Sequence, residues 1–153
     1  MPSFLDIRHL DTHDSRQAFP LIQSLLPSLT LDEWLEFIDA LSLLPQPRAS
    51  GVIAAYNGRG YIHGLFSYAV RADLAHGRIL EVDNFVAFEF PDARGVTREL
   101  ADGMDRLAVD YGCRAIHVDL PERSLAPAAA DPLVAVFKER GHSRHRLGLC
   151  KQL

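Results

Sequence analysis

Three β-strand patterns follow one another in the middle of the chain, and this run constrains the fold more than any other feature. Residues 50–56 and 61–70 are rich in β-branched and aromatic side chains, and they flank Asn57-Gly58, a dipeptide that favours a tight hairpin turn. A loop over residues 72–77 leads to a third strand over residues 78–90. Side chains alternate along a strand. One face of the third strand is therefore expected to carry Val82, Asn84, Val86, Phe88 and Phe90.

Helical patterns lie on both sides of this meander. Before it, residues 4–10 predict a first strand, and two helices follow, the second opened by the capping box Thr30-Leu31-Asp32-Glu33. After it, apolar side chains recur at helical spacing from residue 96, and Gly112 stands where a helix stops. Residues 113–120 predict a short strand, Asp131-Pro132 opens a last helix, and residues 144–153 predict a final strand.

The predicted order is β-α-α-β-β-β-α-β-α-β. It indicates an α/β protein of the α+β kind, with a mixed, mostly antiparallel central sheet flanked by helices. A length of 153 residues is typical of one domain, so we expect a single domain over residues 1–153.

The composition limits the classes of binding partner and the cellular compartment that are expected for this chain. The chain is 48% hydrophobic and 24% charged, with a net charge of −4, so a nucleic-acid or membrane partner is not expected. No apolar stretch approaches the ~20 residues that span a bilayer, and the N-terminus lacks a signal-peptide pattern. Cys113 and Cys150 have no metal-type spacing, which favours a cytoplasmic protein with reduced thiols. The seven histidines show no metal spacing either, so no metal site is expected.

Residues 90–100 read F-P-D-A-R-G-V-T-R-E-L, a strand end that feeds a helix through a glycine turn. Free amides at a helix start and the close approach that glycine permits suit a phosphate. Arg94 and Arg98 are placed to reach it, whereas Asp92 and Glu99 bring negative charge to the same place. By itself the stretch fits either a phosphate loop or an ordinary turn.

Several short motifs resemble the GNAT acetyltransferase superfamily, in addition to the order of elements. They are Pro91 with Arg94-Gly95, a helix of similar length that ends at Gly112-Cys113, the stretch V-F-K-E-R-G-H at residues 136–142, and the two-helix entry S-L-T-L-D-E-W-L at residues 28–35. Three positions differ from the superfamily's pattern, and one of them is Thr97, which stands where members carry glycine or alanine. Asp92 stands where members carry glutamine or arginine, and Phe137 stands where many carry a tyrosine that protonates the leaving thiolate.

The resemblance implies an N-acetyltransferase that moves an acetyl group from acetyl-CoA, its co-substrate, to an amine acceptor by direct attack. The implied contacts of the coenzyme A pyrophosphate are Arg94, Gly95, Val96, Thr97, Arg98 and Glu99. The implied contacts of the pantetheine arm are Val86, Ala87 and Phe88 on the third meander strand. A homodimer formed through the last strands is a further expectation by analogy.

Amine acetylation needs a base, because a protonated amine is not nucleophilic. Glu81 and Asp83 share one face of the third meander strand, where they can accept the proton or attract a cationic amine. Plain surface charge is the alternative interpretation. The general acid stays open among Tyr111, Ser124, His142 and water. The alternative to an enzyme is a catalytically inactive GNAT-like module that binds acyl-CoA or a protein partner.

Overall fold

The computed structural model describes residues 5–43, 49–89, 95–120 and 132–153. The chain divides into two compact units, residues 1–122 and residues 123–153. Each unit is described by itself. The prediction of a single domain stays a prediction.

A mixed five-stranded sheet forms the centre of the first unit, and its strands follow the order β1-β2-β3-β4-β5. They are β1 (Asp6–His9), β2 (Ser50–Tyr56), β3 (Ile62–Asp73), β4 (Gly77–Ala87) and β5 (Ala115–Val118). The first four strands pair antiparallel, and β5 pairs parallel to β4. The predicted meander and the mixed, mostly antiparallel sheet are both confirmed.

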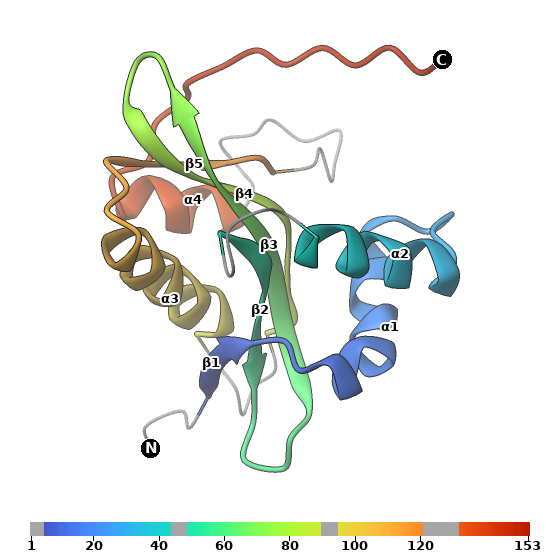
Figure 1. Cartoon of the computed structure of the whole chain (residues 1–153). Helices are drawn as coiled ribbons and strands as arrows, with labels where there is room; N and C mark the ends of the chain where they lie inside the picture. The colour runs from blue at the N-terminus through green and yellow to red at the C-terminus, as the bar shows by residue number, and fades with distance from the viewer. Residues whose placement is uncertain (1–4, 44–48, 90–94, 121–131) are drawn as a thin grey trace. The chain divides into compact units, whose positions relative to one another are not determined.

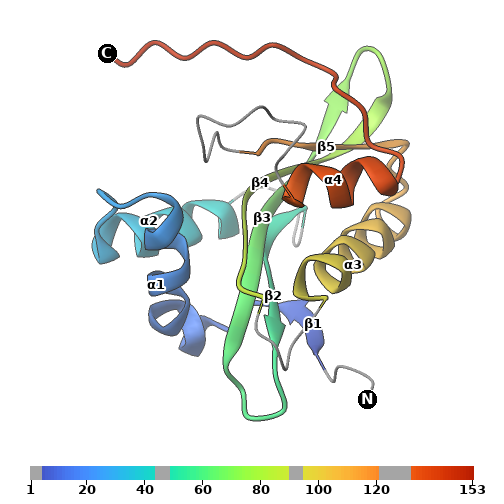
Figure 2. The same cartoon turned by 180° about the vertical axis from the view of Figure 1, so that it is seen from behind.

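Helices cover both faces of this sheet (Figure 1). The 3₁₀ helix η1 (Thr12–Asp14), α1 (Ser15–Leu25) and α2 (Leu31–Ser42) lie on one side, and α3 (Val96–Asp110) lies on the other (Figures 1 and 2). On the α1 and α2 side a core cluster includes Ile22, Trp34, Val52, Leu65 and Val86. On the other side α3 buries Val96, Leu100 and Met104 completely. Within the part of the chain that the structure describes, no helix is long and apolar enough to cross a membrane.

The start of α2 follows from its sequence. The Thr30 hydroxyl oxygen accepts the Glu33 amide at 3.2 Å, and the Glu33 carboxylate accepts the Thr30 amide at 2.8 Å. This is the predicted capping box, which satisfies amides that a helix start leaves free. The Trp34 indole N–H then donates to the Ser15 carbonyl at 2.8 Å. Helices α1 and α2 are thereby joined through a buried hydrogen bond.

The first hairpin is wider than the dipeptide Asn57-Gly58 predicts. Strand β2 ends at Tyr56 and β3 begins at Ile62. The Asn57 side chain accepts the amides of Arg59 and Tyr61, at 2.8 and 3.0 Å. The left-handed backbone falls on Gly60, at φ 81°, and not on Gly58. The turn was predicted at the correct place. It is longer than predicted because the Asn57 side chain accepts amides of the loop and so stabilises it.

The second unit lacks the final strand that residues 144–153 predict. Its helix α4 (Pro132–Glu139) ends near Gly141, at φ 95°, and residues 142–153 form neither helix nor strand. The alternating leucines of this tail, Leu147, Leu149 and Leu153, are 85%, 90% and 110% exposed. A strand needs a neighbour to accept its backbone hydrogen bonds, and alternation alone does not supply one. The observed order therefore ends at α4.

Candidate functional site

Strand β5 pairs along its whole length, but only with the first half of β4. Residues Ile79–Val82 pair with Ala115–Val118, and one more bond joins the Asp119 amide to the Val82 carbonyl at 2.9 Å. Beyond Val82, β4 continues to Ala87 with β3 as its only strand neighbour among the described residues. Figure 2 shows β4 descending beside β3 while β5 crosses its upper end. At Val86 and Ala87 the second edge of β4 therefore has no strand partner within the part of the chain that the structure describes.

A β-bulge lies at the start of this unpaired edge. Leu65 pairs with Val86 and Ser67 pairs with Asp83, so Phe66 alone faces two residues of β4, Asn84 and Phe85. Asn84 takes a left-handed conformation at φ 56°, which asparagine tolerates better than most residues do. Its amide nitrogen donates to the Ser67 hydroxyl at 2.9 Å. Bulges of this kind bend strands and are frequent beside active sites.

The bulge corrects the predicted face of β4. The expectation placed Val82, Asn84 and Val86 on one face. The extra residue shifts the alternation after Asn84, so that Asp83 and Val86 share the face covered by α1 and α2. Phe85 points to the other face, where its ring stacks on that of Phe66 at 6.1 Å between centroids. Strict alternation fails here because one residue of the strand pairs with nothing.

The start of α3 holds a carboxylate. Glu89 accepts the amides of Gly95 and Val96 on Oε2, at 2.9 and 3.1 Å, and the amide of Thr97 on Oε1, at 2.9 Å. Gly95 reaches this arrangement with φ 95°, a backbone conformation that favours glycine. Three successive amides at a helix N-terminus thus converge on one anion.

Comparison with solved structures identifies the architecture. Aminoglycoside N-acetyltransferase AAC(6')-Iy in complex with CoA superimposes with a TM-score of 0.76 at 18% identity, covering 99% of this chain and 97% of that one. A GNAT family acetyltransferase from Staphylococcus aureus gives 0.72 at 14% identity, covering 97% and 98%. A transcriptional regulator from Bacillus halodurans gives 0.76 at 15% identity, covering 97% and 99%. No protein-family profile and no curated protein matches the sequence.

The chain has the GNAT fold. The predicted resemblance to GNAT proteins is confirmed at the level of the fold, and so is the predicted fold class. Identities of 14–18% establish the fold alone.

The predicted coenzyme A loop of this GNAT fold is only partly described. Arg94 and Asp92 lie outside the described residues. Gly95, Val96 and Thr97 contribute backbone amides to one point, while the Val96 side chain is buried in the core. Arg98 is exposed, and the Glu99 amide bonds the Gly95 carbonyl at 2.8 Å inside α3. The predicted pantetheine positions follow the bulge, where the Phe88 amide donates to the His63 carbonyl at 2.9 Å.

The sequence analysis missed Glu89. Burial alone would raise the pKa of its carboxyl group, but the hydrogen bonds from Thr97, Val96 and Gly95 outweigh burial and hold the pKa below its ordinary value. The carboxylate is therefore ionised over the whole neutral range. The signal in the sequence was an acidic residue between the strand end and the glycine turn, but nothing local distinguishes it from Asp92.

Two carboxylates lie on the face of β4 that α1 and α2 cover. Pairing with Ala69 and Ser67 places Glu81 and Asp83 on this face, as the sequence predicts. The Glu81 carboxylate forms an ion pair with Arg71 at 2.6 Å. For Asp83, burial raises the pKa most, the charges of Glu81 and Asp119 raise it further, and Arg71 opposes them. Asp83 is thus a better proton acceptor than an ordinary aspartate, whereas the nearby cation Arg71 forms its ion pair with Glu81.

The candidates for the general acid have different surroundings. Ser124 lies outside the described residues. The Tyr111 ring packs 6.4 Å from the ring of Tyr68, at the end of α3. In the second unit His142 Nδ1 lies 3.2 Å from the carbonyl oxygen of Phe137, and the two rings meet edge to face at 5.2 Å. His142 therefore has a structural position at the end of α4 whether or not it transfers a proton.

Proposed function

We propose that this protein binds an acyl-CoA thioester and transfers the acyl group, an acetyl group in the simplest case, to an amine. One observation carries the proposal. The amides of Gly95, Val96 and Thr97 converge on a single anion beside the part of β4 that has no second strand partner among the described residues. A pyrophosphate suits such a helix start, and an extended pantetheine amide suits an unpaired strand edge. The GNAT fold supports the same function.

The proposed reaction is direct attack of the amine on the thioester carbonyl. A bond from nitrogen to carbon forms, the carbonyl oxygen gains negative charge, and the carbon–sulfur bond then breaks to release the thiolate. A backbone amide near Val86 or Ala87 would stabilise the charged oxygen. Asp83, directly or through a water, takes the proton that the ammonium group must lose before it attacks. The departing thiolate leaves readily, since thiols have a pKa of about 8.5, and it takes up the second proton, which the nitrogen releases after the attack.

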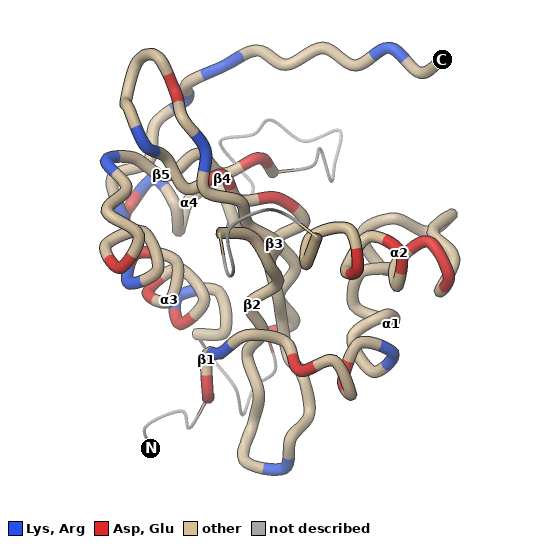
Figure 3. The backbone as a smooth tube through the Cα atoms, viewed as in Figure 1, with Lys and Arg blue, Asp and Glu red and all other residues tan. Residues whose placement is uncertain are grey.

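The charge of the first unit favours a cationic acceptor. Glu81, Asp83 and Asp119 interact electrostatically around β4 and β5. Helix α2 carries Asp32, Glu33, Glu36 and Asp39 and no lysine or arginine. Figure 3 shows acidic positions, coloured red, along α2. An excess of carboxylates on the surface raises the local concentration of an amine cation, so a small polyamine or a lysine-like amine is the proposed acceptor class.

Glu89 sets a condition on this function. The pyrophosphate and the Glu89 carboxylate would use the same three amides, so only one of them is bound at a time. Glu89 is exposed, which allows its side chain to rotate away from α3. Ligand binding therefore begins with an exchange of anions at the helix start.

The occupied helix start also favours a second candidate function. A chain in which Glu89 permanently replaces the phosphates, and in which Phe137 replaces the family's tyrosine, would be a GNAT-like module without catalysis. Such a module would act by binding a protein partner, or acyl-CoA held without transfer.

Calorimetry with coenzyme A, acetyl-CoA and pantetheine tests the proposal. We expect coenzyme A and acetyl-CoA to bind more tightly than pantetheine, which lacks the pyrophosphate that the α3 amides would hold. No heat and no thermal shift with millimolar acetyl-CoA would overturn the proposal. Thioester consumption across a panel of amines then separates the two candidates, because binding without consumption by any amine supports the inactive module.

A further inference from the structure

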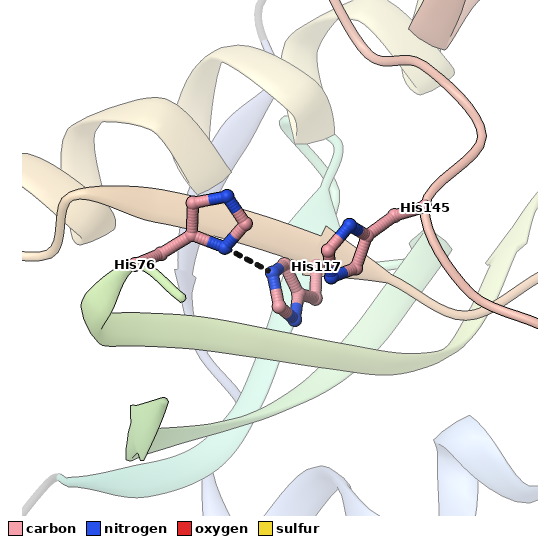
Figure 4. A group of neighbouring side chains, drawn as sticks. All are labelled: His76, His117 and His145. Atoms are coloured by element: carbon pink, nitrogen blue, oxygen red, sulfur yellow. Dashed lines mark hydrogen bonds between the residues drawn. The ribbon is translucent and has the colours of Figure 1, made fainter. Parts of the chain in front are cut away.

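Two histidines meet beside the turn between β3 and β4, away from the start of α3. His76 belongs to that turn and His117 to β5. The Nδ1 atom of His76 lies 3.3 Å from the Nε2 atom of His117, and the rings stand nearly perpendicular, at 83°. Figure 4 shows the two nitrogens pointing toward each other. His145, also drawn there, belongs to the second unit.

A third polar group approaches the same nitrogen. The Asp73 Oδ2 atom lies 3.3 Å from His76 Nδ1, and the Asp73 side chain is only 6% exposed. The same oxygen accepts the amides of Ala75 and His76, at 3.1 and 3.0 Å. These bonds fix the carboxylate within the turn, so its position does not depend on the histidines.

The Nδ1 atom of His76 lies near two polar atoms at once, the Asp73 oxygen and the His117 nitrogen. A neutral imidazole nitrogen either carries one proton or accepts one. If His76 Nδ1 carries the proton, Asp73 and His117 compete for it. If His76 Nδ1 carries no proton, it can accept one from His117, but its electron pair then lies near the electron-rich Asp73 oxygen. A cation beside His76 Nδ1 would attract both of these neighbours, since the His117 nitrogen and the Asp73 oxygen each lie 3.3 Å from that atom.

The spacing of the two nitrogens fits a metal ion. Two imidazole nitrogens that bind one tetrahedral zinc ion at about 2.0–2.1 Å lie roughly 3.3 Å apart. The observed separation is 3.3 Å. A carboxylate oxygen is also an ordinary ligand for zinc. We propose that His76 Nδ1, His117 Nε2 and the Asp73 carboxylate bind a divalent transition-metal ion, with zinc as the reference ion and water in the remaining position.

Such an ion would fasten the β3–β4 turn to the edge strand. Strand β5 has four residues and pairs with β4 alone in the sheet. A metal bond between the turn and His117 would hold β5 to the hairpin through a second attachment. The sequence analysis did not single out this pair, because His76 and His117 are 41 positions apart and metal motifs are recognised from short spacings.

Zinc titration of the untagged, metal-stripped chain tests the site by calorimetry and by thermal denaturation. We expect binding at a stoichiometry of one and a rise in the melting temperature. His76→Gln and His117→Gln should each weaken binding by tenfold or more, and Asp73→Asn should weaken it less. His13→Gln, which changes an exposed histidine in η1, should leave binding unchanged.

Two further measurements keep the outcome interpretable. Circular dichroism of the metal-free variants verifies that they fold. Replacing both free cysteines, as Cys113→Ser with Cys150→Ser, removes competing zinc ligands and should leave the affinity unchanged. The proposal is overturned if zinc does not bind at millimolar concentration, or if folded His76→Gln and His117→Gln variants bind it as the unchanged chain does. Neither readout depends on coenzyme A, so failure of the proposed transfer reaction leaves this test intact.

Discussion

The Glu89 carboxylate lies 2.9 Å from the Thr97 amide nitrogen, eight positions along the chain, and so occupies the start of α3. A GNAT-fold protein would place a pyrophosphate there if it binds acyl-CoA as proposed. One side chain therefore both stabilises the helix and competes with the ligand. This double role makes the effects of changing Glu89 opposite in sign.

Glu89→Ala is expected to tighten coenzyme A binding and to destabilise the fold. Removal of the carboxylate frees the three amides for phosphate, and we expect an affinity gain of about tenfold, or roughly 1.4 kcal/mol. Loss of a helix cap costs about 0.5–2 kcal/mol of unfolding free energy. Calorimetry and urea denaturation measure the two effects. Glu36→Gln, on exposed α2, is the control and should change neither quantity. Weaker coenzyme A binding by folded Glu89→Ala would contradict the competition.

The stabilising effect of Glu89 should depend on pH. Its pKa in the folded protein is lower than the ordinary 4.5, so its contribution is complete above that value and is lost as the pH falls through the folded-state pKa. The difference in unfolding free energy between the unchanged protein and Glu89→Gln should therefore shrink below about pH 4.5. Urea denaturation at a series of pH values measures it, and a difference that stays constant down to pH 2 would rule out the ionised cap.

Asp83→Asn is expected to remove most of the acetyl transfer and to stabilise the fold at neutral pH. Loss of a general base lowers the rate by about 10²–10⁴-fold. The pKa of Asp83 is raised above its ordinary 3.8, first by burial and then by Glu81 and Asp119. Between the two values the folded state binds more protons than the unfolded state, so ionisation of Asp83 costs stability as the pH rises.

A melting temperature of Asp83→Asn above that of the unchanged protein at pH 7, with the gap closing toward pH 3, would bear out this sign. Glu81→Gln is the matched comparison. Its partner Arg71 engages the charge of Glu81, so we expect a smaller loss of turnover. Equal losses from the two variants would argue that neither carboxylate is the specific base.

Gly64→Ala is expected to disturb the contact between β3 and the start of α3. A Cβ atom at this position would lie 2.8 Å from the Val86 carbonyl oxygen and 2.9 Å from Leu100 Cδ1. Overpacking of this kind costs about 1–3 kcal/mol, and it would also move the edge proposed for pantetheine. Urea denaturation measures the cost. Gly58→Ala, where nothing lies within 4 Å, is the control and should be nearly neutral.

The sequence predicted features whose signals are local. The capping box at Thr30 and Glu33 depends on residues three apart, and it formed as expected. The meander follows from strand patterns that adjoin one another. By contrast, the bulge at Asn84 depends on how β4 pairs with β3, and no single residue of β4 predicts it.

The candidate site likewise has some features that the sequence predicts and others that it does not. Glycine at position 95 and the shared face of Glu81 and Asp83 could be inferred from spacing. The capture of the α3 amides by Glu89 could not, because a carboxylate that caps a distant helix start resembles any surface acid in the sequence. The meeting of His76 and His117 depends on strand order, which brings a turn beside β5.

The extra residue at Asn84 gives β4 two halves that are out of phase with each other. Before it, Glu81 and Asp83 face α1 and α2, and after it, Val86 does so in place of Ala87. Deleting Asn84 would restore strict alternation and leave the other residues of the strand on the faces that they now occupy, whereas strict alternation with Asn84 in place would assign one half to the wrong face. Alignments and designs that treat β4 as an uninterrupted strand would therefore bring the carboxylates and the pantetheine edge together in the wrong register.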